Sequence, residues 1–205
     1  MMRFGVRSFL AQEKDLIICG EADCAKDALV AIHRLSPDVV LLDITLRGRS
    51  GLDLLKDLRL LRPRLPVLVY SLHDETIFAE RALRAGARGY LMKQEAGHEI
   101  VSAIRQVLRG EIYLGRALKE RTNAIAGKRP SRTAWTPVAS LSNREFEIFS
   151  LIGRGNTNRE IAGHLHLSVK TVEAHREHIK RKLGLASSTA LNLLAVRWEH
   201  HEFSA

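Results

Sequence analysis

Three closely spaced helix starts in the C-terminal third of the chain constrain its fold more than any other feature. Ser142 stands three residues before Glu145, and Thr157 stands three residues before Glu160. Each pair matches a capping box, in which a hydroxyl and a carboxylate satisfy the free amide groups at a helix start. Ser168 is the type of residue that caps a third helix. The sequence therefore predicts three helices in close succession.

The turn between the first two helices and the composition of the third indicate what this segment does. Gly153 and Gly155 fit a sharp turn between the first two helices. A short helix, a glycine turn and a basic later helix are typical of a helix-turn-helix, whose later helix enters the DNA major groove. The alternative is a small helical bundle with a solvated charged face. The polar and charged residues of the third helix are Lys170, Thr171, Glu173, His175, Arg176, Glu177, Lys180, Arg181 and Lys182.

The order of residues in this segment resembles the DNA-binding domain of LuxR-type regulators. The resemblance implies that Glu173, Ala174 and Glu177 face base edges, with Arg176 beside them. It implies that the final helix, at 187–202, dimerises DNA-bound domains, although core packing explains its apolar spacing equally well. Phosphate contacts, or packing within the domain, are expected of Lys170, Thr171, His175, Lys180 and Lys182. The matching residues are Leu141, Ser142, Arg144, Glu145, Asn158, Glu160, Ile161, Ala162, Ser168, Thr171, Val172, His175, Lys182, Leu183 and Gly184.

The net charge of +9 is concentrated in the half that carries these helices. Residues 1–112 hold 17 Lys and Arg against 15 Asp and Glu, whereas residues 113–205 hold 15 against 8. A basic excess here suits binding to the DNA backbone. The apolar runs are too short to cross a membrane, and the first residues lack a signal-peptide pattern, so we expect a cytoplasmic protein. Cys19 and Cys24 form no C-x-x-C motif and are expected to be buried or half-buried thiols.

The N-terminal half alternates strand-like and helix-like segments. Such alternation predicts an α/β domain with a doubly wound, flavodoxin-like parallel sheet, followed here by an all-α helix-turn-helix domain. The expected domains are residues 1–115 and 138–205, joined by a linker at 116–137. Strands are predicted at 16–19, 39–44, 67–71 and 88–92, and helices at 25–35, 51–61, 76–85 and 97–109. Within the linker, a short helix at 118–125 and a packing role for Trp135 are expected.

Three polar residues fall at the carboxyl ends of predicted strands: Asp43, Ser71 and Lys93. Separately, each has an ordinary explanation, because Asp caps turns, Ser bonds to backbone and Lys is commonly solvated. Together they meet at the edge where reactive groups gather in parallel sheets. A carboxylate nucleophile beside a hydroxyl and an ammonium suits phosphoryl transfer, with Asp43 attacking phosphorus and the other two binding phosphoryl oxygens.

Residues 1–112 resemble the receiver domain of bacterial response regulators. The resemblance implies that Asp43 is the phosphoacceptor, that Ser71 and Lys93 are its catalytic partners, and that Tyr90 is the aromatic residue that moves on phosphorylation. An ordinary strand aromatic is the alternative for Tyr90, since strands favour tyrosine. Both halves together resemble NarL/FixJ-type response regulators. The stretches that carry the resemblance are PDVVLLDI, LPVLVYSLHDE and ALRAGARGYLMK.

The chain departs from the receiver pattern at its start. Receiver domains begin with a strand that ends in an acidic pair, and this pair binds Mg²⁺. Here MMRFGVRSFLAQ resembles the family's first helix, and neither the strand nor the pair precedes it. We expect either further sequence upstream of Met1 or a degenerate receiver, and favour the former because the rest keeps the fold's pattern. Asp43 would bind Mg²⁺ only if the pair exists upstream; otherwise Mg²⁺-dependent phosphorylation should be weak or absent.

The sequence therefore predicts a non-enzymatic, DNA-binding transcriptional response regulator of a two-component system. A sensor histidine kinase would phosphorylate Asp43, and this would control dimerisation and binding to inverted half-sites near promoters. One alternative is a phosphorylation-independent DNA-binding regulator with a degenerate receiver. Another is a quorum-sensing regulator that binds an acyl-homoserine lactone, although such a ligand domain should be richer in aromatic residues than this half.

Overall fold

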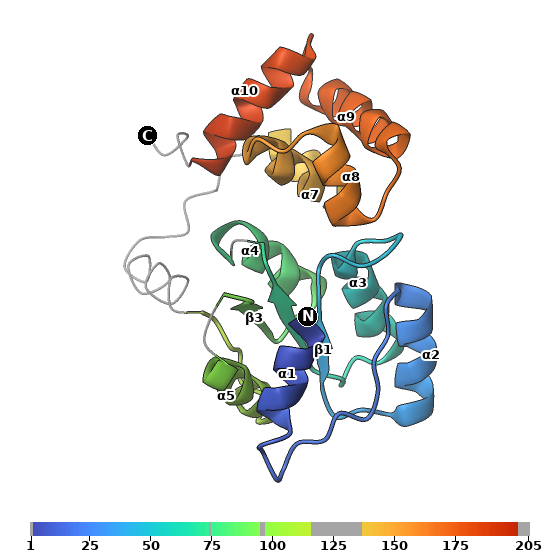
Figure 1. Cartoon of the computed structure of the whole chain (residues 1–205), viewed down its shortest axis with the longest axis vertical. Coiled ribbons are helices and arrows are strands. Elements are labelled where there is room, and N and C mark those ends of the chain that lie inside the picture. The colour runs from blue at the N-terminus through green and yellow to red at the C-terminus, as the bar shows by residue number, and fades with distance from the viewer. Residues whose placement is uncertain (1, 74, 95–96, 116–136, 201–205) are drawn as a thin grey trace. The chain divides into compact units, whose positions relative to one another are not determined.

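A computed structural model describes residues 2–73, 75–94, 97–115 and 137–200 (Figure 1). The chain divides into two compact units, the N-terminal unit Met1–Gly127 and the C-terminal unit Lys128–Ala205, and each is described by itself. Most of the predicted linker, with the helix expected at 118–125 and Trp135, lies outside the described residues. In the part of the chain that is described, no helix is both long and apolar enough to span a membrane.

The N-terminal unit contains a parallel sheet of three strands in the order β1-β2-β3. The strands are β1 (Val40–Leu42), β2 (Val67–Ser71) and β3 (Gly89–Met92). Their register pairs Leu41 with Leu68 and Val69 with Tyr90. Because the strands are parallel, their carboxyl ends lie along one edge of the sheet. The predicted parallel α/β architecture is confirmed.

Within the described residues of this unit, five helices accompany the sheet: α1 (Met2–Leu10), α2 (Ala25–Leu35), α3 (Gly51–Leu61), α4 (Glu75–Ala85) and α5 (Gly97–Leu108). Helix α1 packs against α5, which also contacts β2 and β3, while α4 contacts β3 and α3. Figure 1 shows α1 and α5 on one side of the strands and α2 and α3 on the other. This layering buries apolar side chains on the sheet and leaves the strand ends free to carry polar groups.

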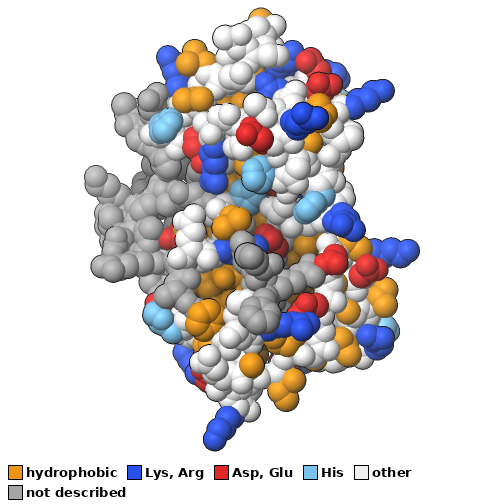
Figure 2. Space-filling view, viewed as in Figure 1, with side chains coloured by type: hydrophobic (Ala, Val, Ile, Leu, Met, Phe, Trp, Pro, Cys, Tyr) orange, Lys and Arg blue, Asp and Glu red, His pale blue; other side chains and the backbone are white. Residues whose placement is uncertain are grey.

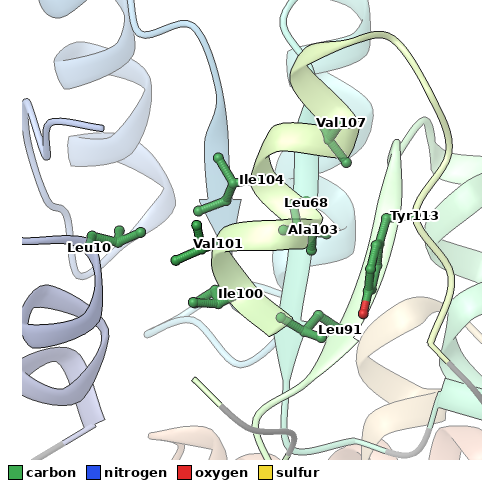
Figure 3. Packing of buried hydrophobic residues seen from close by; sticks show 9 residues of the cluster. All are labelled: Leu10, Leu68, Leu91, Ile100, Val101, Ala103, Ile104, Val107 and Tyr113. Carbon is green, nitrogen blue, oxygen red and sulfur yellow. The ribbon is translucent and has the colours of Figure 1, made fainter. Parts of the chain in front are cut away.

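The packing between α5, α1 and the sheet forms a continuous hydrophobic cluster (Figure 3). Helix α5 supplies most of it at helical spacing, β2 and β3 supply one leucine each, and α1 adds Leu10. Burying these side chains stabilises the unit by about 25 cal/mol for each Å² of apolar surface removed from water. The cluster consists of Leu10, Leu68, Leu91, Ile100, Val101, Ala103, Ile104, Val107 and Tyr113.

The strand predicted at 16–19 is wrong, because the structure leaves these residues without regular secondary structure. Ile17 is 89% exposed and Ile18 is 38% exposed. Cys19 is also exposed, contrary to the expectation of a covered thiol, whereas Cys24 is half-buried. The physical reason lies in the sheet. Among the described residues, the sheet consists of β1, β2 and β3, and residues 16–19 do not lie alongside any of these strands in a hydrogen-bonded ladder.

The C-terminal unit is helical throughout its described residues. A short 3₁₀ turn, η1 (Pro137–Ser140), precedes α7 (Asn143–Gly153), α8 (Asn158–Leu165), α9 (Val169–Leu183) and α10 (Ser188–Glu199). Helix α7 packs against α10, α9 and α8, and α8 packs against α9. This arrangement confirms the predicted all-α domain, and α8 followed by α9 forms the helix-turn-helix.

The helix starts follow the predicted capping. Both capping boxes are complete. The Ser142 hydroxyl accepts from the amide of Glu145, and the Thr157 hydroxyl accepts from the amide of Glu160. Each glutamate side chain in turn accepts from the backbone amide of its capping residue. Ser168 accepts a hydrogen bond from the amide of Thr171 at 3.0 Å. Gly155 occupies the α7–α8 turn with a φ of +81°, where glycine is the favoured residue. Gly153 instead ends α7, and a Cβ there would lie 2.5 Å from the Ala195 carbonyl oxygen of α10.

Candidate phosphoacceptor site and recognition helix

The structure brings two of the three predicted strand-end residues into direct contact. Asp43 follows β1 and Lys93 follows β3, and the Lys93 ammonium donates to the Asp43 carboxylate, Nζ to Oδ2, at 2.5 Å. The Lys93 side chain is 11% exposed and that of Asp43 is 31% exposed. The carboxylate therefore stays open to solvent while its cationic partner is mostly covered.

Ser71 lies at the end of the strand between these two. It is fully buried, and its hydroxyl accepts from the amide of His73 at 3.2 Å. The carbonyl oxygen of Ser71 accepts from the amide of Lys93 at 2.8 Å, which fixes the ends of β2 and β3 side by side. The three predicted residues thus occupy one edge of the sheet, as the parallel arrangement requires.

Two further residues at this edge, Thr45 and His73, escaped the sequence reasoning. The amide of Thr45 donates to Asp43 Oδ1 at 3.0 Å, which orients the carboxylate. The Thr45 hydroxyl lies 3.2 Å from His73 Nε2, so the loops after β1 and β2 are tied together. The signal in the sequence was only positional, since each residue stands two places beyond a predicted strand-end residue.

Tyr90 of β3 points into the unit and is fully buried. Its hydroxyl donates to the backbone oxygen of His73 at 2.8 Å. The ring of His73 lies against that of Phe78 in α4, with centroids 4.5 Å apart. Tyr90 is therefore linked to the loop that follows Ser71, and this loop contacts α4 through Phe78.

The donor set at this edge does not match a Mg²⁺ site. Magnesium requires near-octahedral oxygen coordination. Among the described residues no group of three acidic, histidine or cysteine side chains could hold a metal ion. Asp43 Oδ2 is bound to Lys93, and Asp15, a carboxylate near the start of the chain, is bound to Arg105 at 2.6 Å.

Helix α9 buries one face and exposes another. Val172 and Ile179 are fully buried against the rest of the C-terminal unit. Of the predicted base-facing residues, Glu173, Ala174 and Glu177 are all exposed. Figure 2 shows basic and acidic side chains interspersed over one face of each unit. The exposed stripe of α9, as we name it below, consists of Lys170, Glu173, Ala174, Glu177, His178 and Arg181.

Several other predicted DNA-contacting residues bond within the unit. Arg176 donates to the Asn192 side chain of α10 at 2.8 Å, and burial lowers the pKa of its guanidinium. Lys182 donates to Glu145, the capping carboxylate of α7, at 2.6 Å. These contacts join α9 to α10 and α7, so both side chains hold the unit together. Two of the others have partners on α9 or its cap: Lys180 pairs with Glu177 at 2.8 Å, and the Thr171 hydroxyl bonds to that of Ser168.

Sequence reasoning also missed two members of the exposed stripe. Arg181 stands four residues after Glu177, and His178 stands four residues after Ala174. Both are exposed on the same side of α9 as Glu173, Ala174 and Glu177. The i, i+4 spacing from the base-facing positions was the signal that could have identified them.

Acidification from pH 7 to about 5 should destabilise the C-terminal unit through His175. Burial, followed by the positive charge of Arg144, holds the pKa of the half-buried His175 below its ordinary value. The unfolded chain therefore takes up the proton first, and stability is lost as the pH falls below about 6.5. Urea midpoints followed by tryptophan fluorescence will show this, because both tryptophans belong to this unit.

The variant His175→Gln should flatten the dependence of the urea midpoint on pH over this range. His164→Gln, an exposed position of α8 that is not among the groups acting on the His175 pKa, is the matched control and should keep the wild-type slope. An unchanged slope in His175→Gln would show that another group is responsible.

Below about pH 4.5 a second loss of stability of this unit should follow from Glu145. Burial would raise the pKa of Glu145, but Lys182 and Ser142 together hold it below the ordinary value, so this stability is lost as the pH falls and the carboxylate is protonated.

Comparison with known proteins matches both halves of the chain. The family described as "Response regulator receiver domain" matches residues 1–105, and "Bacterial regulatory proteins, luxR family" matches residues 139–195. Response regulator GacA of Pseudomonas aeruginosa is 36% identical over 197 residues, covering 96% of this chain and 91% of that protein. Response regulator UvrY of Escherichia coli is 34% identical, with 96% and 89% covered.

Solved structures show the same fold. RcsB of Salmonella typhimurium superimposes with a TM-score of 0.63 at 22% identity, covering 95% of this chain and 90% of that one. These likenesses favour a two-component regulator over the phosphorylation-independent alternative. The chain belongs to the response regulators that join a receiver domain to a LuxR-type DNA-binding domain, a family of transcriptional regulators rather than enzymes.

Proposed function

We propose that this protein acts in the cytoplasm, where phosphorylation of Asp43 by a sensor histidine kinase controls its dimerisation and its binding to inverted half-sites near promoters. The contact between Lys93 Nζ and Asp43 Oδ2, at 2.5 Å, is the observation that carries the proposal. It places a cation beside a solvent-accessible carboxylate at the edge of a parallel sheet. RcsB, which shares the fold, has been seen bound to promoter DNA in the presence of the phosphomimetic BeF₃⁻.

The chemistry at Asp43 is transfer of a phosphoryl group to a carboxylate. An Asp43 oxygen attacks phosphorus, a new O–P bond forms, and the bond from phosphorus to the donor breaks, with its electron pair leaving on the donor. Lys93 moves its hydrogen bond from Oδ2 to a phosphoryl oxygen and offsets the added charge. Ser71, once its hydroxyl turns toward the acyl phosphate, donates to a second phosphoryl oxygen.

Receiver domains generally bind Mg²⁺ at the phosphorylation site. In this chain one carboxylate, Asp43, is the only such ligand at the described strand ends, so Mg²⁺ binding requires further oxygen ligands. Bound there, the metal would add positive charge at the phosphoryl oxygens. Lys93 supplies part of the same neutralisation from within the described residues.

The link from Asp43 to the rest of the receiver runs through backbone contacts. Phosphorylation draws the Ser71 hydroxyl from the amide of His73, which loosens the loop that also binds Tyr90. Movement of this loop shifts α4 through the His73–Phe78 ring contact. A dimer formed through such a rearranged surface would bring two DNA-binding units to adjacent half-sites.

The test combines phosphorylation with DNA binding in the full chain. Acetyl phosphate should add one phosphoryl group, visible by intact mass, and strengthen binding to a duplex selected from a random pool by roughly 5- to 150-fold. Asp43→Asn should abolish both effects and leave the basal affinity unchanged. A mass gain in Asp43→Asn, or a phosphorylated wild type with unchanged DNA affinity, would contradict the proposal.

A further inference from the structure

The exposed stripe of α9 has an unusual order of charges. Cations stand near its two ends, Lys170 and Arg181, and carboxylates stand at its centre, Glu173 and Glu177. All four side chains are exposed, on the side of the helix opposite the buried Val172 and Ile179. Since the Lys and Arg residues of this unit outnumber its acidic residues, acidic side chains at the centre of a DNA-facing stripe require an explanation.

Pairing within the helix explains the two glutamates only in part. Lys180 and Arg181 stand three and four residues after Glu177, whereas Lys170 stands three residues before Glu173, in the less favourable order of charges. Glu173 and Glu177 stand at i and i+4, where like charges destabilise a helix by about 0.2–0.5 kcal/mol. Glu173 lies beyond the first turn of α9, so the helix dipole contributes little there. Within the described residues Glu173 forms no ion pair, and the one cation three residues on, Arg176, is bound to Asn192. Glu177 has the partly exposed Lys180 as its partner.

Proximity to DNA makes the arrangement more costly still. Duplex DNA carries one negative charge for about every 1.7 Å of its length, so two carboxylates inserted into its groove are repelled by every sequence. That repulsion is offset only where a base presents a hydrogen-bond donor. In the major groove, cytosine N4 and adenine N6 present donors, whereas guanine and thymine present acceptors at the corresponding positions. Adenine also presents the acceptor N7 beside its donor, which repels the second carboxylate oxygen, so glutamate favours cytosine.

We infer that α9 selects half-sites in which two cytosines lie about two base steps apart, one read by Glu173 and the other by Glu177. The inference rests on the proposed DNA-binding function and names the sequence class that this function requires. The two residues are separated by about 6 Å along the helix axis, against about 3.4 Å for each base step. Ala174, which is small and exposed between them, leaves room for a thymine methyl or an unread base pair.

The flanking cations hold the helix in this register. Lys170 and Arg181 lie about 16 Å apart along the axis, far enough to reach phosphates on either side of the groove. Lys180, one turn from Glu177, screens that carboxylate in the free protein and can turn to a phosphate on the complex. The ends of the stripe therefore supply affinity, and its centre supplies selectivity at the expense of affinity for other duplexes.

The experiment is a selection of duplexes from a random pool by the full chain, with wild type, Glu173→Gln and Glu177→Gln in parallel. Wild type should enrich two cytosines at the stated spacing. Each variant should lose its preference at one of them, because glutamine pairs with adenine instead, and should bind unrelated duplexes more tightly. In anisotropy titrations, replacing one of the cytosines should weaken wild type by roughly 5- to 150-fold and the matching variant much less.

Lys170→Ala provides the contrasting control. It removes a phosphate contact, so it should weaken all duplexes alike and reduce the slope of log affinity against log salt by about one. If Glu173→Gln and Glu177→Gln enrich the same sequences as wild type, the glutamates are solvated side chains and the inference is wrong, although DNA binding stands. Failure of wild type to bind any duplex would overturn the proposed function as well.

Discussion

Replacing Arg144 by methionine should lower the free energy of unfolding of the C-terminal unit by about 3–5 kcal/mol. Arg144 Nη1 pairs with Glu147 Oε2 at 2.6 Å, and the two side chains are 10% and 0% exposed. Arg144 Nη2 also donates to the Leu165 carbonyl oxygen at the end of α8. Methionine fills much of the same volume but removes the positive charge, so the Glu147 carboxylate loses its buried counterion. Urea unfolding followed by tryptophan fluorescence isolates this unit, since it contains both tryptophans.

A double variant and a surface pair show whether burial is the cause. Arg144→Met combined with Glu147→Leu removes both charges and should recover most of the loss, because apolar residues often replace a buried ion pair at no cost. Lys180→Met breaks a pair of the same i, i+3 spacing in the same unit. The Lys180 side chain is 16% exposed, but the carboxylate left behind, Glu177, is 61% exposed and stays hydrated, unlike Glu147. It should cost less than about 1 kcal/mol. Equal losses in Arg144→Met and Lys180→Met would contradict this account of the buried pair.

The elements that sequence analysis predicted correctly are those whose ends are specified locally. Helices α2 and α3 and strand β2 begin and end where the pattern placed them. Ser50 caps α3 by accepting from the amide of Leu52, and Ser36 ends α2 in a left-handed conformation just before a proline. The contact between Asp43 and Lys93 was also predictable, although 50 residues separate them, because strand ends converge in a parallel sheet.

The features that sequence analysis missed depend on partners that the local pattern does not specify. Residues 16–19 have the composition of a strand, but a strand forms only beside another one. Nothing in the sequence indicated that Arg176 would bond to Asn192, or that Lys182 would bond to Glu145. A basic residue on a predicted recognition helix gives the same sequence pattern whether its side chain faces phosphate or a neighbouring helix. Only the packing of α9 against α7 and α10 separates the two groups.

Gly51→Ala should displace the segment that carries Asp43, the proposed phosphoacceptor. A Cβ at Gly51 would lie 2.1 Å from the Asp43 carbonyl oxygen and 2.9 Å from Ile44 Cα. The approach is this close because the Gly51 amide donates to the Ile44 carbonyl oxygen at 2.6 Å. The added methyl meets backbone atoms that cannot rotate away, so relief requires movement of the segment that carries Asp43. A loss of about 1–3 kcal/mol in the stability of this unit is expected.

The effect should be local, and hydrogen exchange followed by mass spectrometry can locate it. Peptides covering residues 40–60 should exchange faster in Gly51→Ala than in wild type. Labelling of the full chain by acetyl phosphate should also fall, because the displaced Asp43 no longer lies within hydrogen-bonding distance of Lys93. Gly5→Ala is the matched control: Gly5 lies in α1, a Cβ there meets nothing within 4 Å, and alanine favours helix by about 1 kcal/mol. If Gly51→Ala shows the exchange and labelling of wild type, the start of α3 can shift without moving Asp43. The geometry of the site would then not require glycine at this position.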